Sequence, residues 1–133
     1  MCSNFSRLSS IENQLDSKTI SNIQKWLDGT YDSATKEQII KWIEQKKIEE
    51  LTDSFYKDLE FGTGGLRGIM GVGSNRVNKY TFGTATQGLS NFLNKTYPNQ
   101  QIKVAVAYDC RNNSDTLAQL VADVFSANGI QVY

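Results

Sequence analysis

The chain has 133 residues, enough for about one domain, and its 14 Lys and Arg residues balance 14 Asp and Glu residues, so the formal net charge is zero. This balance, without a basic run, excludes the positive surface that most nucleic-acid binders need, and no apolar run approaches the ~20 residues of a membrane span. The sequence has no histidine and two distant cysteines, which excludes histidine acid–base catalysis and most zinc sites. With no secretory signal evident, we expect a cytoplasmic protein.

The first part of the chain predicts a helical arm at residues 1–58. Residues 18–27 have the spacing of a short amphipathic helix that ends at Gly29. The next helix is predicted to open with Thr35 and Gln38, which form a capping-box pattern. An apolar stripe then continues this helix as far as Leu59: Ile40, Ile43, Ile48, Leu51, Phe55 and Leu59. We interpret the stripe as packing surface.

A glycine-rich run follows the arm, with four glycines among residues 61–68. Such a run brings backbone N–H groups close to an anion, and Thr63 and Arg67 add a hydroxyl and a guanidinium suited to phosphate. The run is not a P-loop, because no Gly-Lys-Ser/Thr follows at the right spacing, and it is not a dinucleotide fingerprint, because Arg67 replaces the last glycine. A plain glycine-rich turn into a strand explains the composition equally well. Composition alone leaves both interpretations open.

The next segment predicts a helix at residues 78–96. Its apolar residues fall at helical spacing: Phe82, Ala85, Leu89, Phe92 and Leu93. Gly83 and Gly88 weaken this helix intrinsically, and we expect them to allow close packing against a neighbouring element.

The last segment predicts a βαβ unit. Residues 102–108 are nearly all apolar, which is typical of a strand buried on both faces of a parallel sheet. Residues 117–125 have clear helical spacing, Asn128-Gly129 ends that helix, and residues 130–133 alternate like a strand. The predicted fold class is α/β, with a partial mixed or parallel sheet after an α-helical arm. Because a sheet this small is unfinished, we expect the chain to be part of a longer protein and its open edge to favour self-association.

A second polar group stands between the predicted strand and helix. Asp109, Arg111 and Ser114 lie at the carboxyl end of the strand, where open α/β sheets bind ligands, and the amino end of a helix favours an anion. Arg111 can reach a phosphate, and Asp109 can orient an arginine or a loop amide. The alternatives are Ser114 or Asn113 as an ordinary N-cap and Asp109 as a turn residue. Cys110 has no partner base in the pattern and is interpreted as incidental.

Both polar groups, in this order, resemble the α-D-phosphohexomutases, the family of phosphoglucomutase and phosphomannomutase. The family pattern Phe-Gly-Thr-(Ser, Ala or Gly)-Gly-Leu-Arg-Gly stands complete at residues 61–68, and Tyr-Asp-x-Arg-x-x-Ser stands at residues 108–114. Residues 69–78 and 85–89 look like the phosphoglucomutase/phosphopentomutase branch. Residues 127–133 match the next helix-to-strand passage of the family.

The resemblance implies an isomerase of carbohydrate metabolism. A phosphoserine passes its phosphoryl group to a sugar phosphate, and the bisphosphate intermediate returns the other one, which interconverts sugar 1-phosphate with sugar 6-phosphate or, for pentoses, 5-phosphate. The resemblance also implies Mg²⁺, an activator of the glucose 1,6-bisphosphate type, and a four-domain chain, of which residues 59–133 are an incomplete first domain. The loops for the serine, the metal and the sugar are expected elsewhere in the longer protein.

What carries over by position is a set of phosphate- or substrate-binding residues: Thr63, Gly64, Gly65, Arg67, Arg111 and Ser114. Arg67 and Arg111 are implied to support catalysis electrostatically. No residue matches the nucleophile or a metal ligand, so we expect the chain alone to be inactive, with a small sugar phosphate and the rest of the mutase as its partners and no membrane or nucleic-acid partner. The alternatives are a non-catalytic phosphosugar-binding module and a plain α/β interaction domain.

Overall fold

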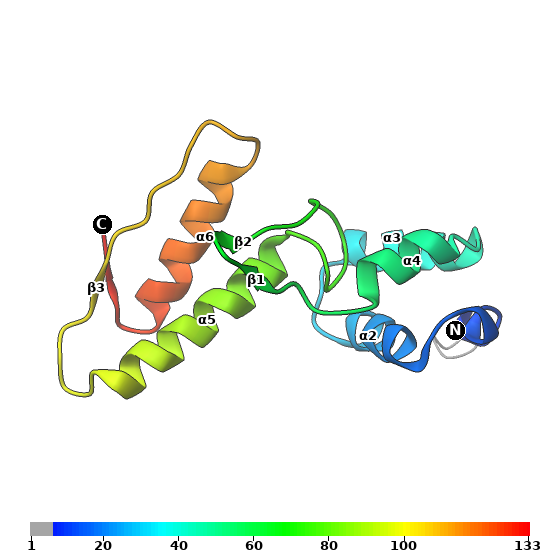
Figure 1. Cartoon of the computed structure of the whole chain (residues 1–133), viewed down its shortest axis with the longest axis horizontal. Coiled ribbons are helices and arrows are strands. Elements are labelled where there is room, and N and C mark those ends of the chain that lie inside the picture. The colour runs from blue at the N-terminus through cyan, green and yellow to red at the C-terminus, as the bar shows by residue number, and fades with distance from the viewer. Residues whose placement is uncertain (1–6) are drawn as a thin grey trace. The chain divides into compact units, whose positions relative to one another are not determined.

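The computed structural model describes residues 7–133 (Figure 1). They form two compact units, here called the first unit, which ends at Asn78, and the second unit, which begins at Lys79. Helices and two small sheets alternate along the chain, which confirms the predicted α/β class. The predicted division between residues 58 and 59 stays a prediction, and residues 1–6 of the predicted arm lie outside the described part. None of the helices in residues 7–133 has the length and apolar character that crossing a bilayer requires.

In the first unit, a short 3-10 turn, η1 (Glu12–Gln14), precedes α2 (Ser17–Asp28). α2 matches the helix predicted at residues 18–27, and Gly29 stands at its carboxyl end as predicted. Its start is fixed by Asp16, whose carboxylate accepts hydrogen bonds from the backbone N–H groups of Lys18 and Thr19, both at 3.0 Å. The bonds satisfy N–H groups that the first helical turn leaves unpaired.

The next helix, α3 (Ser33–Glu44), begins earlier than predicted. Asp32 is its N-cap residue and accepts a hydrogen bond from the Thr35 N–H at 2.8 Å, so the capping box predicted at Thr35 and Gln38 is wrong. A carboxylate suits this position because it both accepts N–H bonds and faces the positive end of the helix dipole.

The predicted continuous helix as far as Leu59 is also wrong. α3 ends at Glu44, Lys46 adopts a left-handed φ of 52°, and a separate helix, α4 (Ile48–Phe55), follows. A left-handed residue cannot continue a right-handed helix, so the chain turns there. The apolar stripe still packs inward on both sides of the break, since Ile43, Leu51 and Phe55 are buried.

The core of the first unit lies between these helices. Ile23, Ile39, Leu51 and Phe55 are each 0% exposed, and each contributes about 1.5–3 kcal/mol through its removal from water. Aromatic rings close one side of this core, because the Trp26 ring stacks on Tyr31 at 4.3 Å and meets Phe55 edge-on at 5.6 Å.

A buried amide ties α2 to the end of α4. Asn22 donates a hydrogen bond from Nδ2 to the carbonyl oxygen of Phe55 at 2.8 Å. Because this carbonyl belongs to the last residue of α4, the bond fixes the point at which the chain leaves the helical arm.

The second unit contains α5 (Lys79–Thr96), β3 (Lys103–Val104), α6 (Ser114–Ala127) and β4 (Gln131–Val132). The two strands are parallel, with Lys103 opposite Gln131 and Val104 opposite Val132, which confirms the predicted βαβ unit. α6 ends at Asn128 and Gly129, with Gly129 at a φ of 74°. Figure 1 shows α5 and α6 lying side by side in this unit.

The strand predicted at residues 102–108 is shorter and less buried than expected. β3 comprises only Lys103–Val104, although backbone hydrogen bonds to residues 131–133 extend from Ile102 to Val106. Side chains alternate between half-buried (Ile102, Val104, Val106) and exposed (Lys103, Ala105, Ala107). The prediction of burial on both faces is therefore wrong. Within residues 7–133, β4 alone pairs with β3, and a two-stranded sheet leaves one face of each strand uncovered.

The helix predicted at residues 78–96 is confirmed by α5, but its packing differs from the expectation. A side chain added at Gly83 or Gly88 would meet nothing within 4 Å, so no close neighbour uses these glycines in the described chain. Leu89 and Phe92 are exposed as well. The buried residues of α5 are Thr86 and Ser90, and Gln87 and Asn128 exchange side-chain hydrogen bonds of 2.9 Å in both directions.

Candidate functional site

The glycine-rich run folds as a tight hairpin, called here the glycine hairpin (residues 61–66). β1 (Phe61–Gly62) and β2 (Gly65–Leu66) are antiparallel, with Gly62 opposite Gly65, and Thr63 and Gly64 form the turn. Gly65 has a φ of 110°, a conformation that residues with a side chain rarely adopt. The turn therefore depends on glycine for backbone shape, and crowding has no part in it, because nothing lies within 4 Å of a Cβ at Gly65.

The turn presents several hydrogen-bond donors that the chain itself does not use. The backbone N–H groups of Thr63 and Gly64 and the hydroxyl of Thr63 have no acceptor among residues 7–133. Both residues are exposed, so these donors face solvent. Backbone N–H groups gathered at an exposed glycine turn are a common element of anion sites.

Arg67 places a positive charge beside this turn. Its Nε and Nη2 atoms lie 3.7 Å from the position of a Cβ at Gly62, and its Nη2 atom lies 3.9 Å from that at Gly64. The guanidinium thus lies across the hairpin, and it forms no ion pair with any carboxylate in the described part of the chain. An unpaired guanidinium and free N–H groups on one turn attract oxyanions.

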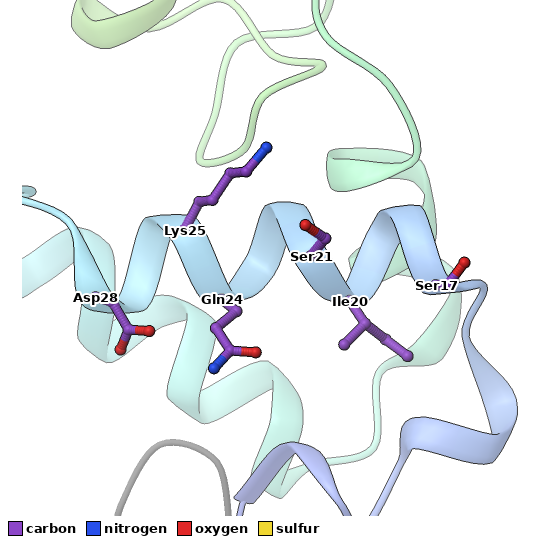
Figure 2. A pocket seen from close by; sticks show the side chains of 6 residues that line it. All are labelled: Ser17, Ile20, Ser21, Gln24, Lys25 and Asp28. Atoms are coloured by element: carbon purple, nitrogen blue, oxygen red, sulfur yellow. The ribbon is translucent and has the colours of Figure 1, made fainter.

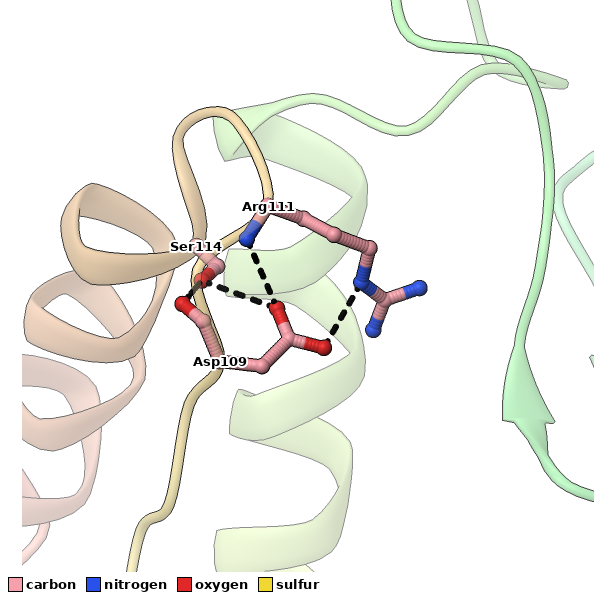
Figure 3. A network of polar contacts seen from close by, with 3 residues as sticks. All are labelled: Asp109, Arg111 and Ser114. Carbon is pink, nitrogen blue, oxygen red and sulfur yellow. Dashed lines mark hydrogen bonds and ion pairs between the residues drawn. The ribbon is translucent and has the colours of Figure 1, made fainter.

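The second predicted group forms a closed hydrogen-bonded loop in the second unit, called here the Asp109 loop (residues 109–114). Figure 3 shows the Arg111 side chain folded back so that its Nε donates to Asp109 Oδ2 at 2.8 Å, while the Arg111 backbone N–H donates to Oδ1 at 3.1 Å. Ser114 Oγ donates to the backbone oxygen of Asp109. Asp109 thus holds both an arginine and a loop amide, and its bond to the backbone N–H two residues on equally fits the alternative of a turn residue.

These contacts change the acid–base behaviour of Asp109. The backbone N–H of Arg111, with further help from its positive side chain and from Ser114, holds the pKa of the Asp109 carboxyl below its usual range. The Arg111 side chain is 85% exposed, so its guanidinium remains accessible to a second anion from solvent.

The start of α6 differs from an ordinary capped helix. Asn113 occupies the N-cap position in a left-handed conformation, with a φ of 62°, and its side chain makes no capping hydrogen bond. Ser114 is the first helical residue, so the alternative in which Ser114 is the N-cap is wrong. Its hydroxyl belongs to the Asp109 loop.

Two surface hollows of the first unit are lined by other residues. One of about 410 Å³ follows an exposed face of α2 (Figure 2). Another, of about 310 Å³, lies between α3, α4 and the chain after the glycine hairpin, beside Trp42, Met70 and Arg76. Neither contains a predicted site residue. Cys110 is exposed and forms no disulfide among the described residues.

The structure distributes the predicted residues over two places. Thr63, Gly64, Gly65 and Arg67 come together on the glycine hairpin of the first unit, and Arg111 and Ser114 on the Asp109 loop of the second. The sequence related residues 69–78 to one branch of the family but did not predict that they contact the base of the hairpin. The small and polar residues of this segment (Gly71, Gly73, Ser74, Asn75, Asn78) were the available signal.

Comparison with known proteins decides the family. Residues 58–133 match the family described as phosphoglucomutase/phosphomannomutase, alpha/beta/alpha domain I. This chain belongs to the α-D-phosphohexomutase family. The matched residues include both the glycine hairpin and the Asp109 loop, so the predicted resemblance is confirmed for the amino-terminal domain.

Individual phosphohexomutases support the same assignment. A phosphoglucomutase of Staphylococcus aureus is 36% identical over 108 residues, which cover 81% of this chain and 18% of that protein. Phosphopentomutases of Homo sapiens and Pongo abelii are 33% identical over 125 residues, which cover 89% of this chain and 20% of theirs. The chain thus spans about a fifth of the length of these relatives. No solved structure matches it.

Proposed function

We propose that this chain supplies part of the phosphate-binding residues of a phosphoglucomutase- or phosphopentomutase-type active site. The observation that carries the proposal is the set of unused donors on the glycine hairpin: the N–H groups of Thr63 and Gly64, the Thr63 hydroxyl and the Arg67 guanidinium. A phosphate monoester offers three oxygens, and charge-assisted bonds to such oxygens are the strong ones. The names of the relatives support a sugar phosphate as the ligand.

The reaction would be the interconversion of sugar 1-phosphate with sugar 6-phosphate, or with 5-phosphate for pentoses. A phosphoserine elsewhere in the enzyme gives its phosphoryl group to a sugar hydroxyl, and the serine oxygen later accepts the other phosphoryl group from the bisphosphate. The donors of the hairpin hold the non-bridging oxygens during both transfers, and Arg111 with Ser114 binds a second anionic group. An activator of the glucose 1,6-bisphosphate type fits the same donors.

The described residues of this chain do not by themselves offer a metal site. Among residues 7–133, no three acidic, histidine or cysteine side chains gather closely enough to hold a metal ion. Mg²⁺ would neutralise charge on the transferring group in the whole enzyme, but no step performed by this chain runs through it. We further propose that the chain alone does not catalyse transfer, because transfer needs positioning from several sides, and that it works in the cytoplasm.

Binding of glucose 1,6-bisphosphate, followed by titration calorimetry with the 133-residue chain, tests the proposal. Arg67→Ala removes the cation and should weaken binding roughly 10- to 100-fold, the usual cost of losing a charged hydrogen bond. Arg111→Ala should weaken it less, because Arg111 is already paired with Asp109. Lys41→Ala is the matched control, since it removes an exposed positive charge of the same unit at α3. Equal affinities for wild type, Arg67→Ala and Lys41→Ala would remove the phosphate-binding interpretation and leave a plain interaction domain.

A second candidate is a phosphosugar-binding module without catalysis. It is favoured by the fact that the hairpin and its donors belong to a unit with its own buried core. Complementation separates the two candidates. A mutase that lacks only the segment matching residues 58–133 would regain phosphoglucomutase activity with this chain only under the first proposal.

A further inference from the structure

The glycine hairpin is the tip of a loop that is closed at its base. The Leu59 N–H donates to the Ser74 carbonyl oxygen at 2.8 Å, which joins the chain before the hairpin to the chain eight residues after it. Behind it the chain folds back on itself, because the Val77 N–H donates to the Ile69 oxygen at 2.9 Å and the Gly71 N–H to the Val77 oxygen at 3.1 Å. We call residues 69–78 the anchor segment. Because the loop is closed, the orientation of the hairpin follows that of its base.

The anchor segment is bonded to the carboxyl end of α4. The Asn75 N–H donates to the Ser54 oxygen at 3.0 Å, the Asn75 side chain to the Asp53 oxygen at 2.9 Å, and Ser74 Oγ to the Lys57 oxygen at 2.7 Å. Carbonyl groups at the end of a helix lack partners within the helix. The anchor segment thus satisfies the end of α4 and is itself fixed by it.

A side-chain ion pair adds to these backbone contacts. Arg76 Nη2 contacts Asp53 Oδ2, and Arg76 Nη1 lies 3.4 Å from the Asp53 backbone oxygen. The Arg76 side chain is only 13% exposed, so it has far less freedom than an ordinary surface arginine. This pair joins two residues that are 23 positions apart, across the base of the loop.

The backbone of the anchor segment also lies very close to the backbone of α4, and we call these contacts together the joint between α4 and the anchor segment. Gly73 has a φ of 131°, and a Cβ there would lie 2.4 Å from the Ser54 oxygen, so only glycine fits. The Asn78 side chain closes the other end by donating to the Gly71 oxygen at 2.9 Å and the Gly73 oxygen at 3.0 Å. The anchor segment is therefore held by hydrogen bonds and by close backbone contact at several points along its length.

We propose that Arg76, paired with Asp53, is a positioning residue for phosphate binding on the glycine hairpin. The inference rests on the proposed function. It means that α4, through Asp53, fixes the orientation of the glycine hairpin before the ligand binds. Donors that are already fixed lose less conformational freedom when an anion binds, so fixing the base raises affinity without adding a contact to the ligand. The ligand is a phosphate monoester, and Arg76 itself does not touch it.

The test measures the affinity of the 133-residue chain for glucose 1,6-bisphosphate in Arg76→Ala, Arg76→Lys and Asp53→Asn. Arg76→Ala and Asp53→Asn should each weaken binding about three- to tenfold, as expected when one or two side chains must be ordered on binding. Arg76→Lys should keep part of the affinity that Arg76→Ala loses. Asp53→Arg and Arg76→Asp should each weaken binding as single variants, and the double variant that carries both should bind more tightly than either. Lys47→Ala is the matched control, because it breaks the ion pair with Glu50 near the start of α4.

A second measurement reports on the hydrogen bond that closes the base of the loop. Amide hydrogen exchange at Leu59, whose N–H bonds Ser74, should accelerate in Arg76→Ala and not in Lys47→Ala. If wild type binds the ligand, Arg67→Ala loses it and Arg76→Ala keeps wild-type affinity, the positioning role is wrong while the proposed function stands. If wild type does not bind or Arg67→Ala changes nothing, the proposed function fails and the positioning role falls with it. Loss of affinity in both single variants, without recovery in the exchanged pair, would also overturn the inference.

Discussion

Replacing Gly73 by alanine is expected to loosen the joint between α4 and the anchor segment. The added Cβ would lie 2.4 Å from the Ser54 backbone oxygen and 2.8 Å from its Cβ. Backbone atoms at the end of a packed helix cannot move aside as a flexible side chain does. The chain around Gly73 must therefore shift, and the neighbouring bond from the Asn75 N–H to the Ser54 oxygen is lost with it.

Two terms give the size of the effect. A residue with a side chain held at the φ of 131° costs about 1–3 kcal/mol. Loss of the Asn75 hydrogen bond adds about 0.5–1.5 kcal/mol. The free energy of unfolding should thus fall by about 1.5–4.5 kcal/mol, a large part of the 5–15 kcal/mol that is typical of a small domain.

Urea unfolding followed by tryptophan fluorescence measures this change, because Trp26 and Trp42 both lie in the first unit. Gly64→Ala is the matched control: its φ is not left-handed, and its Cβ would meet only Arg67 Nη2, at the ordinary distance of 3.9 Å. We expect that variant to change the unfolding free energy by less than about 0.5 kcal/mol. Equal effects of the two alanines would refute the reasoning from close approach and backbone conformation.

Two further predictions concern the second unit. Gly88→Ala should stabilise this unit by about 0.5–1 kcal/mol, because Gly88 lies within α5 and a Cβ there would contact nothing. Thermal unfolding followed by circular dichroism measures the change, and an unchanged or lower midpoint would contradict the prediction. Asp109 has a lowered pKa, so the stability that it contributes is present above the ordinary aspartate value of 3.8 and is lost as pH falls through its folded pKa. The amide chemical shift of Arg111 should therefore titrate below pH 3.8 and lose this transition in Asp109→Asn; a midpoint at or above 3.8 would contradict it.

The sequence predicted which helices and strands are present better than it predicted the residues at which they begin and end. Apolar spacing was enough to predict α2, α5, α6 and the parallel strand pair, because the helical period is a local property. It did not reveal the break between α3 and α4, since a single left-handed residue, Lys46, turns the chain without interrupting the apolar stripe. The prediction for residues 102–108 failed for a different reason, because burial depends on what covers a strand and not on its own composition.

The candidate site was predictable in part. Composition at residues 61–68 indicated the turn and its donors, but not that these donors lack an acceptor within the described chain, because that depends on the groups that the fold brings near. The ion pair between Asp53 and Arg76 could not be predicted from the sequence, because no local pattern relates a residue of α4 to one 23 positions later. The predicted domain boundary at residues 58 and 59, the self-association and the roles of the site residues stay predictions.

The buried apolar side chains are divided unevenly between the two units. Among the described residues, only Phe125 and Ile130 of the second unit reach the burial of the many core side chains of the first. Because resistance to local opening follows buried apolar area, mild denaturing conditions should open β3, α6 and β4 while the helical arm persists. A protease that cleaves opened chains would therefore remove the carboxyl-terminal part first, and the surviving core would still carry the glycine hairpin and Arg67.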